Sequence, residues 1–281
     1  MSLFNFGAKR CIHRQDVKHH PNCFNKDGTP KSNVQMTAVK VLVLDVETLP
    51  ILGYTWDVWN TNINPAGVKK DWCILSWSAK WLNDDKMMSD VLTPSEAVAR
   101  DDSRLVASFW KLLDDSDIII SHNGRRFDIR KLNTRFWKNK MHPPSSYKVI
   151  DTLSAAKGVF GLTYNSQSFI AKFLGIQEKL DTDLALWISC DDGDRKSLSY
   201  MREYNENDVD MLEQIYLEIR AWIPNHPNMR VYGNLSGACP VCLSSDYREI
   251  GLYTSSTNRY KEYRCNSCGS IWHDSKKIKE K

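Results

Sequence analysis

The run from Val41 to Pro50, VLVLDVETLP, places two acidic side chains inside an apolar, β-branched stretch. A run of this kind is typical of a buried strand, so the chain is expected to build a sheet around it. Positions i and i+2 of a strand point to the same face, which means that Asp45 and Glu47 project together. Two buried carboxylates are costly unless they are neutralised, and a divalent cation relieves their repulsion. The run therefore predicts a strand that presents a pair of metal ligands.

Further segments along the chain carry the patterns of strands and helices. We expect strands at 40–47, at 72–82 beside the first, and at 117–123. We also expect a strand end that enters a helix over 147–160, and helices at 103–116, 127–140, 167–176 and 197–223. Strands that come first and then alternate with helices favour an α/β fold, with a mixed sheet flanked by helices.

Two of the expected helices add acidic residues in defined settings. Asp128 falls in the first turn of the helix that starts near Phe127. Tyr204 and Asp208 lie four residues apart on the long helix and therefore share one face. Four carboxylates from one strand and two helices are suited to holding two hard cations.

Together these motifs resemble the DEDD superfamily of 3′→5′ exonucleases, whose members share a ribonuclease H-like fold. The resemblance covers residues 38–224 and rests on three motifs in order: DVE at 45–47, NGRRFD at 123–128 and YNEND at 204–208. The third motif is the tyrosine variant (DEDDy), which also occurs in the proofreading domains of family B DNA polymerases. Other segments, ETLP and WDVWNTNI among them, resemble exonuclease-like proteins of phages.

The resemblance implies that Asp45, Glu47, Asp128 and Asp208 hold two Mg²⁺ or Mn²⁺ ions, because all-oxygen ligands favour those metals. Such ions would activate a water and stabilise the departing 3′ oxygen, and Tyr204 would orient that water. We expect hydrolysis of DNA at single strands or 3′ ends. An exoribonuclease with the same site stays open, since recognition of a 2′-hydroxyl depends on pocket geometry. A non-catalytic nucleic-acid-binding or regulatory zinc-ribbon protein is the other alternative.

The expected roles of the neighbouring polar residues are less specific. His122, Asn123 and Arg125 are candidates for substrate contact, and Asn123 has the alternative role of capping the following helix. Asp151 is expected to cap a helix, and Asp210 to lie on another helix face in solvent. Five further acidic residues are expected to form an acidic loop: Asp181, Asp183, Asp191, Asp192 and Asp194.

The pairs Cys239/Cys242 and Cys265/Cys268 are separated by the 22 residues 243–264, which is the spacing of a zinc ribbon with one tetrahedral Zn²⁺. So small a unit has too little core of its own, so this zinc would be structural. The intervening hairpin has residues suited to gripping a nucleic-acid backbone and stacking on bases: Arg248, Arg259, Lys261, Arg264, Tyr247, Tyr253, Tyr260 and Tyr263. Packing of the ribbon against the exonuclease or a partner protein is the alternative.

The N-terminal segment offers a second set of zinc ligands, namely Cys11, His13, Cys23 and one of His19 or His20, of which His20 is preferred. A disordered basic arm with incidental ligands is the alternative.

Charge and composition divide the chain into five expected parts. The outer segments are basic: residues 1–37 carry six Lys and Arg against two Asp and Glu, and residues 225–281 carry nine against five. The middle, 38–224, carries 23 against 27, which suits a carboxylate-built site whose flanks hold a polyanion, although solvated surface charge is the alternative. The expected parts are a Cys/His-containing segment 1–37, an exonuclease domain 38–224, a linker 225–232, a ribbon 233–275 and a charged tail 276–281.

The same composition bears on location and partners. The sequence has neither an eighteen-residue apolar run nor an apolar leader, so we expect no membrane span and no secretion. We expect a cytoplasmic protein, in the host cytoplasm if it is phage-encoded. Its expected partners are nucleic acid, DNA before RNA, and a replication or repair protein.

Overall fold

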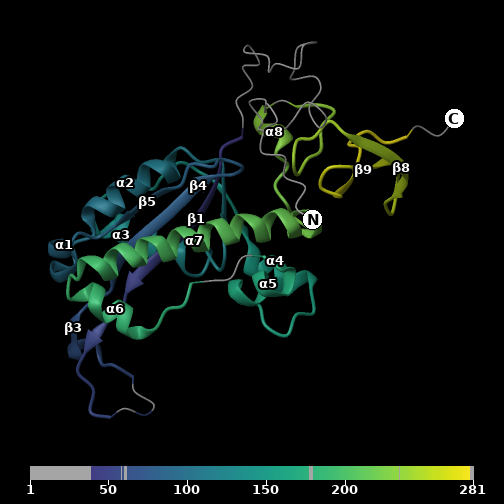
Figure 1. The fold of residues 1–281 in the computed structure, drawn as a ribbon. Coiled ribbons are helices and arrows are strands. Elements are labelled where there is room, and N and C mark those ends of the chain that lie inside the picture. Colours follow the sequence, from purple (N-terminus) through teal and green to yellow (C-terminus); the bar gives the residue numbers. More distant parts are fainter. Residues whose placement is uncertain (1–38, 58, 60–61, 177–179, 234, 279–281) are drawn as a thin grey trace. The chain divides into compact units, whose positions relative to one another are not determined.

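The computed structural model describes residues 39–57, 59, 62–176, 180–233 and 235–278 (Figure 1). The N-terminal ligands Cys11, His13, His19, His20 and Cys23 lie outside the described residues, so the second zinc site stays a prediction. The described chain divides into two compact units, one from Lys40 to Tyr216 and one that begins at Leu217.

The first unit is built on a mixed five-stranded sheet in the order β5-β4-β1-β6-β7. The strands are β1 (Val41–Leu49), β4 (Cys73–Trp81), β5 (Met88–Val91), β6 (Ile118–Ser121) and β7 (Lys148–Asp151). Strand β1 runs antiparallel to β4 and parallel to β6, which places the acidic strand in the middle of the sheet. The expected strand at 72–82 does lie beside the first.

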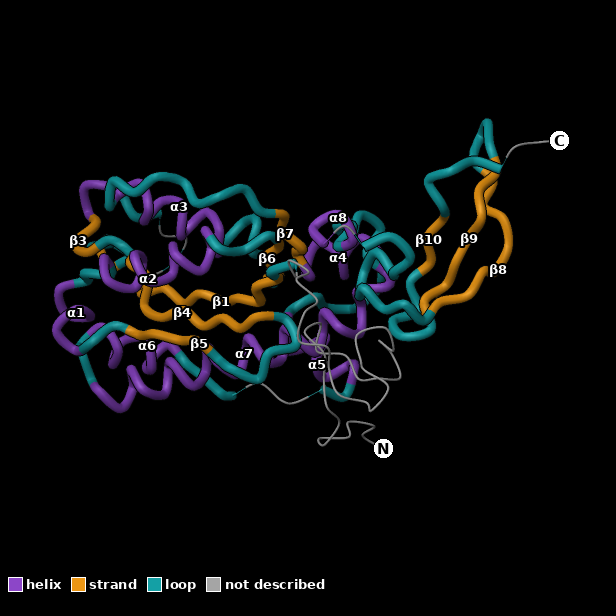
Figure 2. Tube along the Cα trace, turned by 90° about the horizontal axis from the view of Figure 1, so that it is seen from above, coloured by secondary structure: helices purple, strands orange, loops and turns teal. Residues whose placement is uncertain are grey.

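Helices cover both faces of this sheet. They are α1 (Pro94–Ala99), α2 (Ser103–Asp114), α3 (Asp128–Lys138), α4 (Thr152–Val159), α5 (Gln167–Leu174), α6 (Leu184–Asp191) and α7 (Arg195–Ile219), with a 3₁₀ turn at Arg220–Trp222. Figure 2 shows α2 and α3 on one face of the sheet, and α6 and α7 on the other. The mixed α/β fold expected from the sequence is therefore confirmed.

The core forms because apolar side chains recur at helical and strand periods. Helix α2 buries Leu105, Phe109 and Leu113, which lie four residues apart along one stripe. The Phe109 ring packs against Trp77 of β4, with the ring centroids 5.0 Å apart. This packing fixes the sheet from which the acidic residues of β1 project.

One expectation about acidic residues was wrong, and a second was incomplete. The expected acidic loop is interrupted by helix α6, where Asp183 accepts a hydrogen bond from the Leu186 amide at the N-terminus. At the other end of α6, Asp191 pairs with Arg100 at 2.8 Å. Asp210 is 48% exposed at its side chain, in line with the expectation of a solvated residue, and it also pairs with Lys80 at 2.9 Å. Asp191 and Asp210 thus contact basic residues that are far away in the sequence, whereas Asp183 caps its own helix.

A short arm leaves the sheet directly after β1 and returns before β4. It contains the paired strands β2 (Leu52–Gly53) and β3 (Val68–Lys70), with a 3₁₀ turn at Pro65–Gly67. Arg100 ends α1 in a left-handed conformation (φ 52°) and donates from Nη1 to Pro50 O at 2.7 Å and to Asp71 O at 2.8 Å. One guanidinium thus holds both ends of the arm.

The second unit contains a three-stranded antiparallel sheet in the order β10-β9-β8 (Figure 2). Its elements are α8 (Arg230–Gly233), β8 (Tyr247–Thr254), β9 (Arg259–Cys265) and β10 (Ile271–His273). Strands β8 and β9 confirm the hairpin expected between the cysteine pairs. The expected linker 225–232 contains the beginning of α8.

Among the described residues, no helix combines the length and apolar character that crossing a membrane requires.

Candidate active site and cysteine cluster

The acidic end of β1 projects past its pairing with a neighbouring strand. Strand β1 pairs with β6 only from Val41 to Val43, whereas its pairing with β4 continues through Asp45 and Glu47. The register of β1 against β4 shifts after Glu47, which is the mark of a bulge. One edge of β1 is therefore open where the two carboxylates stand.

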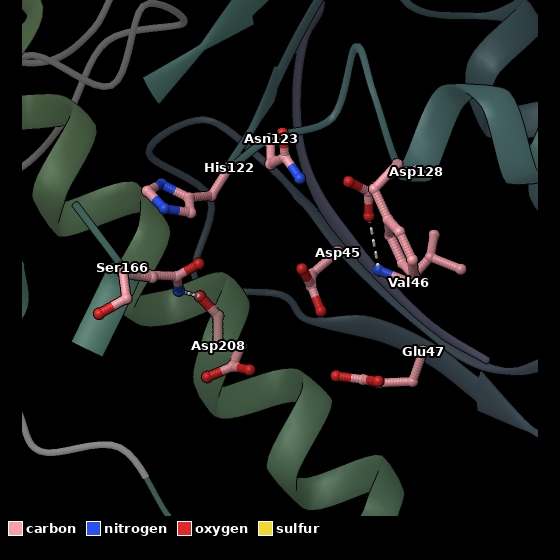
Figure 3. Close-up of a pocket in the computed structure, with 10 residues that line it drawn as sticks. Asp45, Val46, Glu47, His122, Asn123, Asp128, Ser166 and Asp208 are labelled. Atoms are coloured by element: carbon pink, nitrogen blue, oxygen red, sulfur yellow. Dashed lines mark hydrogen bonds between the residues drawn. The ribbon is translucent and has the colours of Figure 1, made fainter. Parts of the chain in front are cut away.

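Helix α7 brings a third carboxylate to the face of β1 that carries Asp45 and Glu47. One oxygen each from Asp45, Glu47 and Asp208 lies within 4.8 Å of the others (Figure 3). Asp208 is 3% exposed, and the two strand carboxylates are half-buried. Three carboxylates this close repel one another unless a cation or a proton intervenes. Their all-oxygen donor set fits a hard divalent ion.

Asp128 lines the same pocket from the first turn of α3, as expected, but it is not one of these three clustered residues. Its Oδ1 accepts a hydrogen bond from the Val46 amide at 3.1 Å, which ties α3 to β1. Burial, and then the nearby charge of Asp45, raise the pKa of Asp128 well above its ordinary value. An ionised Asp128 therefore requires a compensating positive charge.

The turn before α3 depends on a glycine. Asn123 has φ +68°, and its carbonyl accepts hydrogen bonds from the Arg126 and Phe127 amides. A Cβ on Gly124 would lie 1.8 Å from Ser121 Oγ, so a larger residue does not fit. The Asn123 side chain does not cap α3, whose N-cap residue is Phe127, and the capping alternative is wrong.

The carboxylates lie at one side of a cavity of about 330 Å³. The lining residues are Asp45, Val46, Glu47, His122, Asn123, Phe127, Asp128, Ser166, Gln167 and Asp208. His122 is fixed by contacts from Nδ1 to Thr152 Oγ1 at 2.9 Å and from Nε2 to Asn165 O at 3.0 Å. Two of the three expected substrate-contact residues, His122 and Asn123, thus face the cavity.

The remaining sequence candidates lie beside the cavity. Arg125 does not line it, and its Nη2 donates to Val149 O at 2.8 Å. Asp151 caps α4, as expected, by accepting from the Ser154 amide at 3.1 Å. Tyr204 is 4% exposed and packs edge-on against Trp187 at 6.1 Å between centroids. It is one helical turn before Asp208 but is not part of the cavity lining.

Sequence reasoning missed two amide side chains that support the carboxylates. Asn205, fully buried, donates from Nδ2 to Asp45 Oδ2 at 2.6 Å. Gln167 donates from Nε2 to the backbone oxygen of Asp208 at 2.6 Å. The place of Asn205 three residues before Asp208, on one helix face, is a signal that could have found it. Gln167 has no comparable signal in the sequence.

The four expected cysteines of the second unit come together. One sulfur from each lies within 4.8 Å of the others, with 3.7 Å between the Sγ atoms of Cys239 and Cys268 and 3.6 Å between those of Cys242 and Cys265. These distances are far longer than a disulfide of about 2.05 Å. They fit a tetrahedron of Zn–S bonds of about 2.3 Å, so the cluster fits a zinc ribbon.

Comparison with known proteins supports the fold of the first unit. Residues 81–220, which are 140 of the 281 residues, match a family model described as the RNase_H superfamily. This range includes Asp128 and Asp208 but not the strand carboxylates. With its mixed sheet between helical layers, the domain is RNase H-like.

Matches to individual proteins are distant. A search of curated proteins finds no match. A solved structure that matches is the family B DNA polymerase from the hyperthermophilic archaeon Pyrobaculum calidifontis, at 15% identity and a TM-score of 0.46. The alignment covers 74% of this chain and 28% of the polymerase, so this chain spans only a minor part of that protein.

Proposed function

We propose that this chain is a metal-dependent 3′→5′ exonuclease that hydrolyses phosphodiester bonds of DNA at single strands or 3′ ends. The observation that carries the proposal is the convergence of Asp45, Glu47 and Asp208 within 4.8 Å at one side of a cavity, with Asp128 buried beside them. A cluster of carboxylates repels phosphate, so it suits a phosphodiester substrate only with cations between the two.

The proposed ligands of two Mg²⁺ or Mn²⁺ ions are Asp45, Glu47, Asp128 and Asp208. When bound, such ions supply a water of lowered pKa and neutralise the charge that develops on the leaving oxygen. The donor set consists of carboxylates, which these metals prefer over the nitrogen and sulfur ligands typical of zinc.

The protein's own groups position these ligands and the substrate. Asn205 holds Asp45, and the Val46 amide holds Asp128. Tyr204 is proposed to orient the attacking water, because it lies one turn before Asp208 on the same helix. A phenol, whose ordinary pKa is near 10, is better suited to positioning a water than to abstracting its proton. His122 and Asn123 are proposed to contact the terminal nucleotide from the cavity wall. Arg125 is proposed to contact the nucleotides next to the terminal one.

The limited cavity supports action at a strand end. A volume of about 330 Å³ lies at the lower end of the range for ligand pockets. It suits one unpaired terminal nucleotide better than a stacked base pair. We further propose residues 38–224 as the exonuclease domain and 233–275 as a structural zinc ribbon.

A single assay tests the proposal. The purified chain is incubated with 5′-labelled single-stranded DNA or RNA, with Mn²⁺ or with EDTA. We expect a DNA ladder that shortens from the 3′ end with Mn²⁺ only. Asp45→Asn should abolish it, whereas Asp85→Asn, the same change at an exposed residue, should not. Degradation by the Asp45→Asn chain would refute the site, and faster degradation of RNA would overturn the choice of substrate.

A further inference from the structure

The hairpin residues that the sequence offers as nucleic-acid contacts do not share one surface. Residues directly opposite each other in an antiparallel pair project to the same face, and neighbours along a strand project to opposite faces. In the register of β8 and β9, Tyr253 lies opposite Tyr260, while Leu252 lies opposite Lys261. The three-stranded sheet therefore has two faces of different composition.

The first face carries aromatic rings that belong to the core of the ribbon. Tyr247, Tyr263 and Trp272 pack together, with ring centroids 5.5, 5.2 and 5.8 Å apart. Trp272 also packs against the buried cysteines. These rings stabilise the unit around its metal ligands and are half-buried. They are unsuited to stacking on a base.

The second face carries a separate group of three rings, one from each strand. Tyr253 of β8 and His273 of β10 stack at 4.4 Å with an interplanar angle of 6°. Tyr260 of β9 lies 5.1 Å from His273, also between ring centroids. Tyr253 is 39% exposed, and His273 is exposed. We call these residues, Tyr253, Tyr260 and His273, the outer rings.

Two arginines share the face of the outer rings. Arg248 lies directly opposite Arg264 in the ladder, and both side chains are exposed. Like charges at facing positions of a sheet are destabilising, so this pair is suited to an anion that lies between them. Arg248 uses Nη1 to donate to Asn266 Oδ1 at 2.7 Å, which leaves further donors on its guanidinium. Glu262 also projects to this face and is half-buried.

We infer that this outer face binds single-stranded DNA, with bases on the outer rings and phosphates on Arg248 and Arg264. Exposed rings and arginines on one surface match the two chemical parts of a single strand, since every base has a π-face and every linkage a negative charge. A duplex hides its base faces, so it does not satisfy the rings. The identification of the bound strand as DNA rests on the proposed function, whereas the assignment of this face as a binding surface does not.

Binding by the full-length chain tests the inference separately from catalysis. All variants carry Asp45→Asn, and fluorescence anisotropy with a labelled single-stranded DNA is measured without added Mg²⁺ or Mn²⁺. Tyr253→Ala should weaken binding by about fivefold or more, as expected for loss of one stacked base. Leu252→Ala alters the adjacent residue, which is 51% exposed on the opposite face, and should leave binding unchanged. Equal zinc contents verify that both variants keep the ribbon.

Salt dependence tests the arginines. Arg248→Gln and Arg264→Gln should each lower the slope of log K against log salt by about 0.7, the value for one phosphate contact to a single strand. Arg259→Gln, which removes the same charge from the opposite face, should leave the slope unchanged.

Several outcomes would overturn this inference. They are binding by Tyr253→Ala within twofold of the parent chain, an equal loss in Leu252→Ala, an equal effect of Tyr253→Ala on duplex DNA, and tighter binding to RNA of the same sequence. A chain that binds through this face but cuts no DNA would refute the proposed function and leave the face intact. If the parent chain cuts DNA but Tyr253→Ala binds it normally, the binding face would be refuted and the proposed function would stand.

Discussion

Asn205 donates from its amide nitrogen to Asp45 Oδ2 at 2.6 Å, although the two residues are 160 positions apart in the sequence. Ser76 in turn donates from its hydroxyl to Asn205 Oδ1 at 3.3 Å. The hydroxyl and the carboxylate together determine which way the amide points. The orientation of a proposed metal ligand is thus set by a chain of contacts across β4, α7 and β1.

These linked hydrogen bonds predict that Asn205→Ala weakens metal binding. Loss of a group that orients a metal ligand typically costs about 10–100-fold in metal affinity or activity. We expect the Mn²⁺ concentration for half-maximal cleavage to rise by about that factor, with most activity recovered at saturating Mn²⁺. Gln214→Ala, which removes an exposed amide from the same helix, is the control. An unchanged Mn²⁺ requirement would contradict the positioning role.

The turn at Gly124 predicts a steric defect. Gly124→Ala would force Ser121 or the backbone to move, because the new Cβ meets both Oγ at 1.8 Å and Cβ at 2.5 Å. Overpacking of this kind costs about 1–3 kcal/mol, and we expect loss of nuclease activity with a lower melting temperature. The double variant Gly124→Ala/Ser121→Gly removes both contacting atoms and should recover stability. An unchanged melting temperature of the Gly124→Ala variant would contradict the predicted clash.

The raised pKa of Asp128 predicts a stability effect that depends on pH. Its folded-state pKa lies above the unfolded value, so the metal-free fold is penalised as pH rises from the unfolded pKa through the folded one. Asp128→Asn removes this penalty. Without added divalent metal it should melt a few °C higher than the parent at pH 7.5, at about 2–4 °C per kcal/mol, with little difference at pH 4.

Added Mg²⁺ should reverse that difference, since only the parent gains a metal ligand at residue 128. Thermal unfolding of the first unit, followed at both pH values with and without Mg²⁺, provides the measurement. If Asp128→Asn raises the melting temperature equally at pH 4 and pH 7.5, ionisation of Asp128 is not the cause of the increase.

The proposed role of Tyr204 predicts a defect in kcat more than in KM. Tyr204→Phe keeps the ring that packs against Trp187 and removes only the hydroxyl. We expect kcat to fall by up to about 100-fold at saturating Mn²⁺, because a misplacement of a reacting group by about 1 Å can cost that much. Tyr200→Phe, an exposed tyrosine one turn earlier, is the matched control. Full activity of Tyr204→Phe would remove the tyrosine from the mechanism.

The sulfur geometry predicts one zinc ion in the ribbon. Cys265→Ser should lower the zinc content by one ion per chain, measured by elemental analysis, whereas Cys73→Ala, a buried cysteine of β4, should not. A further zinc ion that persists in Cys265→Ser and is lost in Cys11→Ser would support the predicted N-terminal site. An unchanged zinc content in Cys265→Ser would rule out the ribbon site.

The sequence was sufficient for features that depend on local periodicity. The alternation around Asp45 and Glu47 placed both on one face of β1, and the spacing of the cysteine pairs placed four sulfurs together. These predictions succeeded because strand alternation and the cysteine spacing of a zinc ribbon are both patterns that can be read directly from the sequence.

Features that depend on contacts between distant residues were not predicted from local sequence patterns. Helix α6 has a short apolar segment between acidic flanks, and one of those acids, Asp191, is engaged by Arg100, 91 positions away. The grouping of Asp45 and Glu47 with Asp208, with Asp128 at their side, was expected only from the family resemblance, because it depends on how α3 and α7 pack on the sheet. No local pattern encodes such distances, and the same holds for the contact between Asn205 and Asp45.

The grip of Arg100 on Pro50 and Asp71 has a consequence for how such a protein diversifies. Because both ends of the 51–70 arm are held at its base, the intervening chain can lengthen, shorten or be exchanged while β1 keeps its register with β4. Closing a longer loop costs only about 0.6 kcal/mol for each doubling of its length. The arm is thus a natural insertion point, where evolution or an engineer can graft new segments within a few residues of Glu47 without moving the carboxylates.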